Sequence, residues 1–555
     1  AMTLGSISMG AGARMTTASS LTLNSGATLT FDMTGLVAGQ PIINIQSGAL
    51  ALTDANCTLT LNNYGDLEAS DYILAQWTTA GSLTSESFTW TPDIQKEGFE
   101  YSVVVEGNRL VLKVKDVSGD TGFVWNGGTD RKWLNSSTDG WTTKLEDVTT
   151  LDDQEIYFTS AEAGEVKVSG NVTPKSVIIN SGTYTFVSDP DNAGAIADST
   201  DPTTLTVNGN SNVSMNLANT YTGGTQITGG TLSFDYATRT ALGTGGIEVG
   251  QDSTLLYAVN ASGGKTTSLF SNNVTGTGTI ILDNTGQDET KINNAVFAGF
   301  EGELVLRGNL RFHGETGDSL ASIQAITVES GTHLYMDNES SAGTPWNQNF
   351  TIAGTGTGTG NDKAGALRMD NTTISGNLTL SADASIIVYI AGTSTISGNL
   401  IGGDHVLTFN PNNNADRKLV LSGASVAAGG IGSTRAGTLI LGGGTGEDSQ
   451  NTVAELGAGG LNLNANTVLE LNNVTIRATE QWAQSVGSNT VTLADGTTNT
   501  IDTNKTDITF TGNVGGEGSL VKDGDGTLPI GAGSNYTGET TVSGGTLNMN
   551  GAALA

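Results

Sequence analysis

One segment of the chain occurs twice: Tyr221-Thr-Gly-Gly-Thr-Gln-Ile-Thr-Gly-Gly-Thr-Leu-Ser-Phe234 aligns without gaps on Tyr536-Thr-Gly-Glu-Thr-Thr-Val-Ser-Gly-Gly-Thr-Leu-Asn-Met549. The copies lie more than 300 residues apart, and apolar residues match at three positions. The matched pairs are Ile227 with Val542, Leu232 with Leu547, and Phe234 with Met549. Such repetition predicts a solenoid, in which each turn stacks on the next and pairs its strands with those of its neighbours. We therefore expect these six side chains to be buried in stacked positions.

Elsewhere the chain alternates apolar and polar residues with a period of two. Val177 and Ile179 precede the turn Asn180-Ser181-Gly182, and Tyr184 and Phe186 follow it. Similar units surround Asn24-Ser25-Gly26, Asn208-Gly209-Asn210 and Glu329-Ser330-Gly331. Alternation indicates strands with one buried face, and Asn, Ser and Gly favour the tight turns between them. The sequence thus predicts an all-β fold, a right-handed parallel β-helix (β-solenoid) rod with an N-terminal Trp-rich β module.

The composition excludes several classes of protein. The chain has 555 residues with 77 Gly, 8 Pro and 1 Cys, and its formal net charge is −32. Its glycines have no Gly-X-Y period, which excludes collagen, and a single Cys excludes a disulfide-stapled scaffold. No apolar run reaches the length of about 18 residues that a membrane helix needs, so we expect no membrane span. Because so acidic a surface repels phosphate, we also expect no nucleic-acid partner.

Three regions of the chain differ in composition. Residues 64–141 are richer in charged and aromatic residues, and Phe99–Lys115 is predicted to form a hairpin that turns at Gly107-Asn108. A polar loop precedes residue 203. The predicted domains are residues 1–118, an N-terminal β region ending in the hairpin; residues 119–203, a Trp-rich β module and loop; and residues 204–555, the β-helix repeats.

The repeat resembles a known bacterial motif. Asn219–Leu232, and Gly518–Leu528 continuing into Asn535–Leu547, look like the autotransporter-associated β-strand repeat. The resemblance implies the passenger region of a bacterial autotransporter, a right-handed parallel β-helix that is extracellular or exposed at the bacterial cell surface. It also implies an outer-membrane anchor from the family's C-terminal barrel, which this sequence does not contain. Pro529 departs from the repeat, and since proline removes a ladder donor we expect a bulged or distorted turn there.

Few residues are arranged for catalysis or metal binding. Gly317-Asp-Ser-Leu320 matches the nucleophile block of GDSL hydrolases, but the Asp-x-x-His that would activate the serine is missing. We therefore expect no enzyme activity and no cofactor. One Cys and three His cannot form a zinc site with ordinary spacing. Asp523 and Asp525 lie in one tight turn and could supply oxygens to calcium, although a solvated turn is the favoured interpretation.

Trp133 and the basic pair before it form the one candidate ligand contact. Arg131 and Lys132 adjoin an aromatic ring that could stack on a sugar, and the two cations could tolerate a nearby acidic group. The alternative, that Trp133 belongs to the core, stays open, because Trp beside a strand is more often buried. Elsewhere the acidic surface should repel sulfated or sialylated glycans unless a local basic patch intervenes.

These features lead to one predicted function and one alternative. The chain is interpreted as a surface-exposed or secreted autotransporter passenger that acts as an adhesin or interaction scaffold, with a host or cell-surface glycan or protein as its partner. The alternative is a secreted β-helix enzyme, a lyase or glycoside hydrolase that acts on polysaccharide. Acidic or Arg side chains clustered beside an open groove would favour the enzyme, since the fold alone does not establish function.

Overall fold

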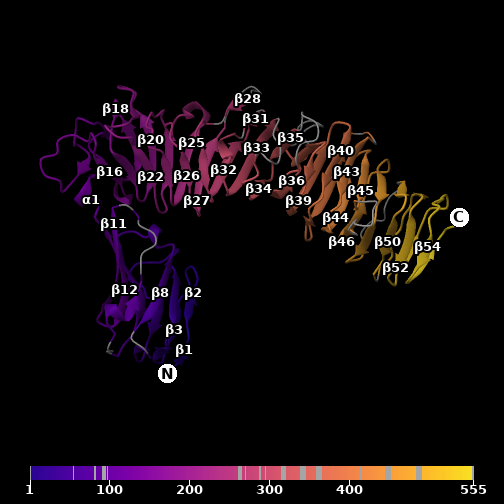
Figure 1. Cartoon of the computed structure of the whole chain (residues 1–555), viewed down its shortest axis with the longest axis horizontal. Coiled ribbons are helices and arrows are strands. Elements are labelled where there is room, and N and C mark those ends of the chain that lie inside the picture. The colour runs from indigo at the N-terminus through magenta and orange to yellow at the C-terminus, as the bar shows by residue number, and fades with distance from the viewer. Residues whose placement is uncertain are drawn as a thin grey trace. The chain divides into compact units, whose positions relative to one another are not determined.

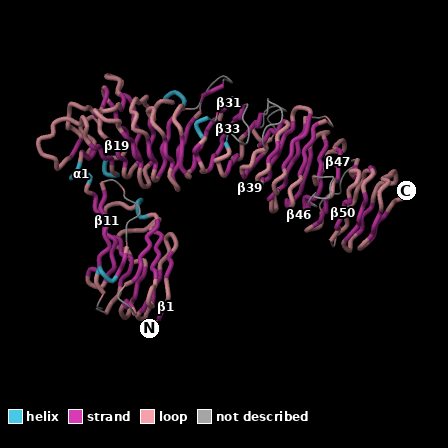
Figure 2. Tube along the Cα trace, viewed as in Figure 1, coloured by secondary structure: helices cyan, strands magenta, loops and turns pink. Residues whose placement is uncertain are grey.

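The computed structural model shows a chain that is almost entirely β. About 3% of it is helical, and the strands form a parallel β-solenoid of about 19 turns. Figure 2 shows that strands and the loops between them make up nearly all of the trace. The predicted fold class is therefore confirmed, whereas the right hand of the solenoid and the separate Trp-rich module stay predictions. The structure describes residues 2–552 except 54–55, 80–82, 91–95, 97, 260–265, 269, 287–288, 294, 314–319, 338–344, 358–364, 413, 415, 444–451, 483–489 and 505.

The turns form where the sequence places Gly after Asn or Ser. Gly182 follows β19 (Ser176–Ile179) with a φ of 99°, and Gly331 follows β34 (Ala325–Val328) with a φ of 81°. Glycine adopts this left-handed backbone at low cost because it lacks a Cβ. The apolar residues on both sides of each turn are buried. The apolar positions of the alternating pattern are therefore those that face inward.

The chain divides into two compact units, which we describe separately. The first comprises residues 1–234 and 238–255, and the second comprises residues 235–237 and 256–555. The domain boundaries expected near residues 118 and 203 stay predictions. Strands that succeed one another along each unit are labelled in Figure 1.

The N-terminal part of the first unit has three small sheets around a core of its own. The hairpin at its end is confirmed: β11 (Phe99–Glu106) pairs antiparallel with β12 (Arg109–Asp116), with Val103 opposite Leu112. β12 also pairs antiparallel with β9 (Ser70–Gln76), so the hairpin extends one of the three sheets. The preceding strands form three turns of three strands each, and each strand pairs parallel with its equivalent in the next turn. The turns are β1 (Met2–Leu4), β2 (Ile7–Met9) and β3 (Met15–Thr17); β4 (Leu21–Leu23), β5 (Thr28–Asp32) and β6 (Ile43–Ile45); and β7 (Leu50–Leu52), β8 (Cys57–Asn62) and β9.

In the rest of the first unit the described strands pair parallel, turn upon turn, apart from β15 (Trp141–Thr142), which pairs antiparallel with β13 (Phe123–Trp125). Ile227 and Leu232 have no exposed surface and Phe234 is 2% exposed, so the burial predicted for the first repeat copy is confirmed. One sheet contains β16 (Glu155–Phe158), β19, β22 (Thr204–Val207), β24 (Thr225–Ile227) and β26 (Ile247–Val249). The facing sheet contains β17 (Gly164–Val168), β20 (Thr183–Ser188), β23 (Asn212–Asn216) and β25 (Gly230–Asp235).

The second unit continues the same pattern with longer strands. The inward-facing side chains of its main sheet include Leu, Ile, Val and Phe. Among the described residues, these side chains are buried almost without exception. Strands of that sheet include β33 (Glu303–His313), β35 (His333–Asp337), β37 (Leu367–Asp370), β39 (Leu378–Val388), β46 (Thr452–Asn462), β48 (Val474–Ala478), β50 (Thr498–Asp502), β52 (Ser519–Asp523) and β54 (Thr540–Val542). A second sheet includes β38 (Thr373–Ile374), β40 (Gly392–Ile396) and β43 (Arg417–Leu421).

The second repeat copy is not buried as the first one is. Val542 is 51% exposed, and Leu547 and Met549 are only half-buried. β54 pairs with β52 on one side, and among the described strands none pairs with its other side. The predicted burial of these three residues is therefore wrong, because a solenoid side chain loses water contact only when a turn covers it on both sides.

Pro529 does not distort its turn. It is the last residue of β53 (Thr527–Pro529), lies in register with Asn548, and its carbonyl accepts a hydrogen bond of 3.0 Å from the Phe510 N–H. The expected bulge is wrong, because a proline at a strand end removes one donor without shifting the ladder.

Candidate functional site

Trp133 lies in the core of the first unit. Its side chain has no exposed surface, and its ring centroid lies 5.7 Å from that of Trp141 and 5.8 Å from that of Phe158. Trp125 packs against the same two partners. A sugar would therefore have to displace packed aromatic rings before it reached either face of Trp133.

The two cations before Trp133 are occupied by partners within the protein. Arg131 donates from Nε to the Glu165 carbonyl at 2.6 Å and from Nη2 to the Glu162 carbonyl at 2.8 Å. Lys132 Nζ lies 3.1 Å from the buried Asp189 carboxylate, and this contact raises the pKa of the lysine. Ligand contact at Arg131, Lys132 and Trp133 stays a prediction, and their geometry explains them as structural residues.

Gly317, Asp318 and Ser319 lie outside the described residues. His333 is fully buried, and its Nδ1 lies 2.7 Å from the Gly365 carbonyl oxygen. That histidine is therefore held as a core residue.

The acidic turn considered for calcium surrounds a lysine. Lys522 has no exposed surface, and its Nζ donates to the carbonyl oxygens of Asp523 at 2.6 Å, Gly524 at 2.8 Å and Gly544 at 3.0 Å. The Asp523 carboxylate accepts from the Gly524 N–H at 2.8 Å, and the Asp525 side chain is exposed. Within the described part of the chain, no cluster of three or more metal-ligating side chains was found. Calcium binding at Asp523 and Asp525 stays a prediction. The carbonyl oxygens of this turn already accept hydrogen bonds from the Lys522 ammonium group.

A ladder of Arg and Tyr side chains crosses three neighbouring strands of the second unit. Arg311 on β33 is the register partner of Tyr335 on β35, which is in turn the partner of Arg368 on β37. The guanidinium carbon of Arg311 lies 4.5 Å from the Tyr335 ring centroid, and that of Arg368 lies 3.8 Å from it. Parallel strands about 4.8 Å apart bring such side chains face to face. Each contact of this kind contributes roughly 0.5–1 kcal/mol near the surface.

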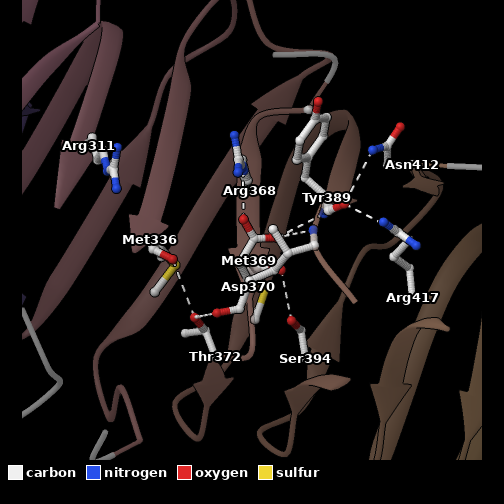
Figure 3. Close-up of polar contacts among 12 residues, drawn as sticks. Arg311, Met336, Arg368, Met369, Asp370, Thr372, Tyr389, Ser394, Asn412 and Arg417 are labelled. Atoms are coloured by element: carbon white, nitrogen blue, oxygen red, sulfur yellow. Dashed lines mark hydrogen bonds and ion pairs between the residues drawn. The ribbon is translucent and has the colours of Figure 1, made fainter. Parts of the chain in front are cut away.

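The ladder continues to Tyr389, whose main chain is held on both sides. The guanidinium carbon of Arg368 lies 4.5 Å from the centroid of the Tyr389 ring. Figure 3 shows the two side chains together with the polar contacts of Asp370 and Arg417. The Tyr389 N–H donates to Asp370 Oδ1 at 2.8 Å, and its carbonyl accepts from Arg417 Nε at 3.0 Å and Asn412 Nδ2 at 3.4 Å. Tyr389 is thus positioned by side chains from two other turns.

Asp370 organises this arrangement. Its side chain is 1% exposed, and Arg368 Nε donates to its Oδ2 at 2.8 Å while two main-chain N–H groups, those of Tyr389 and Ile390, donate to Oδ1. A buried carboxylate is stable only with such partners, because leaving it unpaired costs several kcal/mol. Burial also raises the pKa of the neighbouring Tyr335 phenol. We call Arg311, Tyr335, Arg368, Tyr389 and Arg417 the Arg–Tyr ladder.

Sequence reasoning missed the Arg–Tyr ladder because its members are far apart along the chain. Arg311 and Tyr335 are separated by a different number of residues than Tyr335 and Arg368. No fixed period therefore marks them, and the lengths of the intervening loops decide which side chains become neighbours. No local motif in the sequence marks these residues as neighbours.

The second unit also has a polar pocket of about 420 Å³. Glu480, Gln481 and Thr479 line it from one turn, and Asn504, Thr506 and Asp507 line it from another. Asp507 Oδ1 accepts a hydrogen bond from the Thr527 N–H at 2.6 Å, whereas the Glu480 side chain is exposed. Hydroxyl, amide and carboxylate groups of this kind can bind the hydroxyl groups of sugars.

Comparison with known proteins identifies the repeat. Two segments, residues 200–234 and 520–549, match the family model of the passenger-associated-transport-repeat. The chain carries passenger-associated transport repeats. On a parallel β-solenoid these repeats indicate an autotransporter passenger, the secreted or surface-exposed region of such a protein. No curated protein and no solved structure matched the chain. In the described structure, no helix has the length and apolar character needed to cross a membrane.

The passenger-associated transport repeats share one set of contacts. In the first repeat the Tyr221 hydroxyl lies 2.7 Å from Thr225 Oγ1, and in the second the Tyr536 hydroxyl lies 2.7 Å from Thr540 Oγ1. The glycine two residues after each Tyr packs against the preceding turn, where a Cβ would lie 2.4 Å from a carbonyl oxygen in the first repeat and 2.1 Å in the second. The repeat motif therefore specifies close stacking of turns, and its residues are structural.

Proposed function

We propose that this passenger acts as an adhesin or interaction scaffold and that its partner is a host or cell-surface glycan or protein. The proposal is supported most by the Arg–Tyr ladder, which gathers cationic and aromatic side chains of separate turns on an otherwise acidic chain. Aromatic and guanidinium groups are the side chains that contribute most binding energy in protein interfaces. We further propose that an outer-membrane anchor holds the passenger at the bacterial surface.

A glycan array combined with a measurement of reducing ends tests this proposal. We expect the purified chain to bind a subset of glycans and to release no new reducing ends from them, because a scaffold binds without cleaving. Binding should also be measured on intact host cells, since a protein partner would be invisible on the array. Absence of binding to both glycans and cells would refute the scaffold function.

A second candidate function is a polysaccharide-degrading enzyme, which the polar pocket favours. Glu480 and Asp507 place two carboxylates in one cavity, and paired carboxylates are the usual machinery of glycoside hydrolysis. If the pocket is an active site, Glu480→Gln should lower the release of reducing ends by 100-fold or more, an order expected when a general acid or base is removed. Glu517→Gln, at an exposed glutamate outside the pocket, is the matched control. Equal activity in the wild type and both variants would exclude this pocket.

A further inference from the structure

The segment after β39 presents two side chains on a main chain that has little freedom. Asp370 Oδ1 accepts the N–H groups of both Tyr389 and Ile390, at 2.8 and 3.1 Å. Arg417 and Asn412 hold the Tyr389 carbonyl from the following turn. The Tyr389 ring is half-buried and the Ile390 side chain is 42% exposed. A ligand that contacts them would therefore lose little binding energy to ordering of the protein.

Arg417 differs from most other arginines of the chain. Its Nε donates to a main-chain carbonyl, and among the described residues no carboxylate pairs with it and neither Nη atom has a hydrogen-bond partner. Its side chain is partly exposed, and so is that of Lys418, which follows it. By contrast, the arginines that pair with carboxylates include Arg131, Arg307, Arg311, Arg368 and Arg477. The Nη donors of Arg417 are thus available beside Tyr389, whose carbonyl oxygen its Nε contacts, and Ile390 is the next residue along the chain.

We propose that Tyr389, Ile390 and Arg417 bind a sugar that carries a carboxylate, and that this is the ligand class of the scaffold. The proposal rests on the proposed function. A guanidinium presents two parallel donors that match the two oxygens of a carboxylate. The Tyr389 ring and Ile390 supply apolar surface for the C–H face of the same sugar. Arg368, on the other side of Tyr389, is paired with Asp370 and packs against the Tyr389 ring. Arg368 therefore positions the ring, and Arg417 binds the carboxylate of the sugar.

The net charge of the chain further restricts the class of acidic sugar that can bind. A chain of net charge −32 repels a densely sulfated polyanion over a long range. A sugar with one carboxylate per ring carries less charge and can place a single acid group at Arg417. Uronic-acid glycans have this chemistry, and we therefore expect them to be preferred over sulfated glycans.

The test compares binding of trigalacturonic acid with binding of its methyl ester, in which each carboxylate is replaced by an uncharged ester group. The full chain is titrated with each at moderate ionic strength, and the variants Arg417→Gln and Tyr389→Ala are measured beside it. We expect each variant to weaken the acid at least tenfold, and we expect the wild type to bind the ester at least tenfold more weakly than the acid. Arg109→Gln, at an exposed arginine of the first unit, makes the same change of net charge and should leave affinity unchanged. Thermal unfolding curves that match the wild type show that the variants are folded.

The possible results separate this inference from the function on which it rests. If the acid binds and Arg417→Gln has no effect, the site is wrong while the scaffold function stands. If the acid does not bind but other glycans or host cells do, the ligand class is wrong. If Arg109→Gln weakens binding as much as Arg417→Gln, binding depends on net charge and the site is refuted. If nothing binds, both the inference and the proposed function fail.

Discussion

Replacing Leu232 by Asp is expected to unfold the turns around it. Leu232 on β25 has no exposed surface and lies in register with Val213 on β23. The substitution removes a buried Leu, which costs roughly 2–5 kcal/mol, and introduces a carboxylate without a partner, which costs several kcal/mol more. We expect a loss of at least about 4 kcal/mol, read as a lower unfolding temperature and faster amide hydrogen exchange in β23 and β25.

The second repeat copy provides the matched control for this substitution. Leu547 occupies the equivalent repeat position but is only half-buried, on β55 (Thr546–Asn548), which pairs on one side with β53. Leu547→Asp should therefore change stability by less than about 1 kcal/mol. Equal effects of the two substitutions would show that the described difference in burial between the copies is wrong.

The buried ammonium of Lys522 is expected to be the second large contributor to stability. Its Nζ donates to three main-chain carbonyls, and it joins the turn after β52 to the turn that contains Gly544. Lys522→Met keeps much of the side-chain volume but leaves these acceptors without their donor. We expect a loss of roughly 2–4 kcal/mol, because each buried unsatisfied group costs about 1–3 kcal/mol. Lys418→Met, at a partly exposed lysine, should have almost no effect in the same unfolding measurement.

The pH dependence of the Lys522→Met effect gives an independent check. Burial lowers the pKa of Lys522 below its ordinary value of 10.5. Between the folded-state pKa and that ordinary value the unfolded chain binds more protons, so wild-type stability rises with pH through this window. The Met variant lacks this contribution. A difference between the two proteins that stays constant up to and beyond pH 10.5 would contradict a shifted Lys522.

Most of the fold could be predicted from the alternation of apolar and polar residues and from the residues of the turns. Val177, Ile179, Tyr184 and Phe186 are buried on either side of a turn at Gly182, as their spacing predicts. The same holds for the antiparallel hairpin at residues 99–116, where a Gly-Asn turn set the register. These features could be predicted because they depend on a few consecutive residues, whose side chains point alternately to the two faces of a strand.

The candidate site could not be predicted in the same way. The sequence places Arg131 and Lys132 next to Trp133, but proximity along the chain says nothing of which face each side chain occupies, and Trp133 is in the core. Tyr389 and Arg417 lie on different turns and meet through a main-chain carbonyl. Lys522 aligns with the buried Val207 of the first copy, so an apolar side chain or an enclosed ammonium can occupy the same position.

The sequence by itself determined that this chain is a β-solenoid, because period-two patterning, glycine turns and a repeated motif each act within one turn or between adjacent turns. Only the tertiary structure decided which charged and aromatic side chains lie beside one another. The physical reason is that the register between turns depends on the length of every intervening loop. Arg311, Tyr335 and Arg368 form a ladder because loops of unequal length bring the three to one register position.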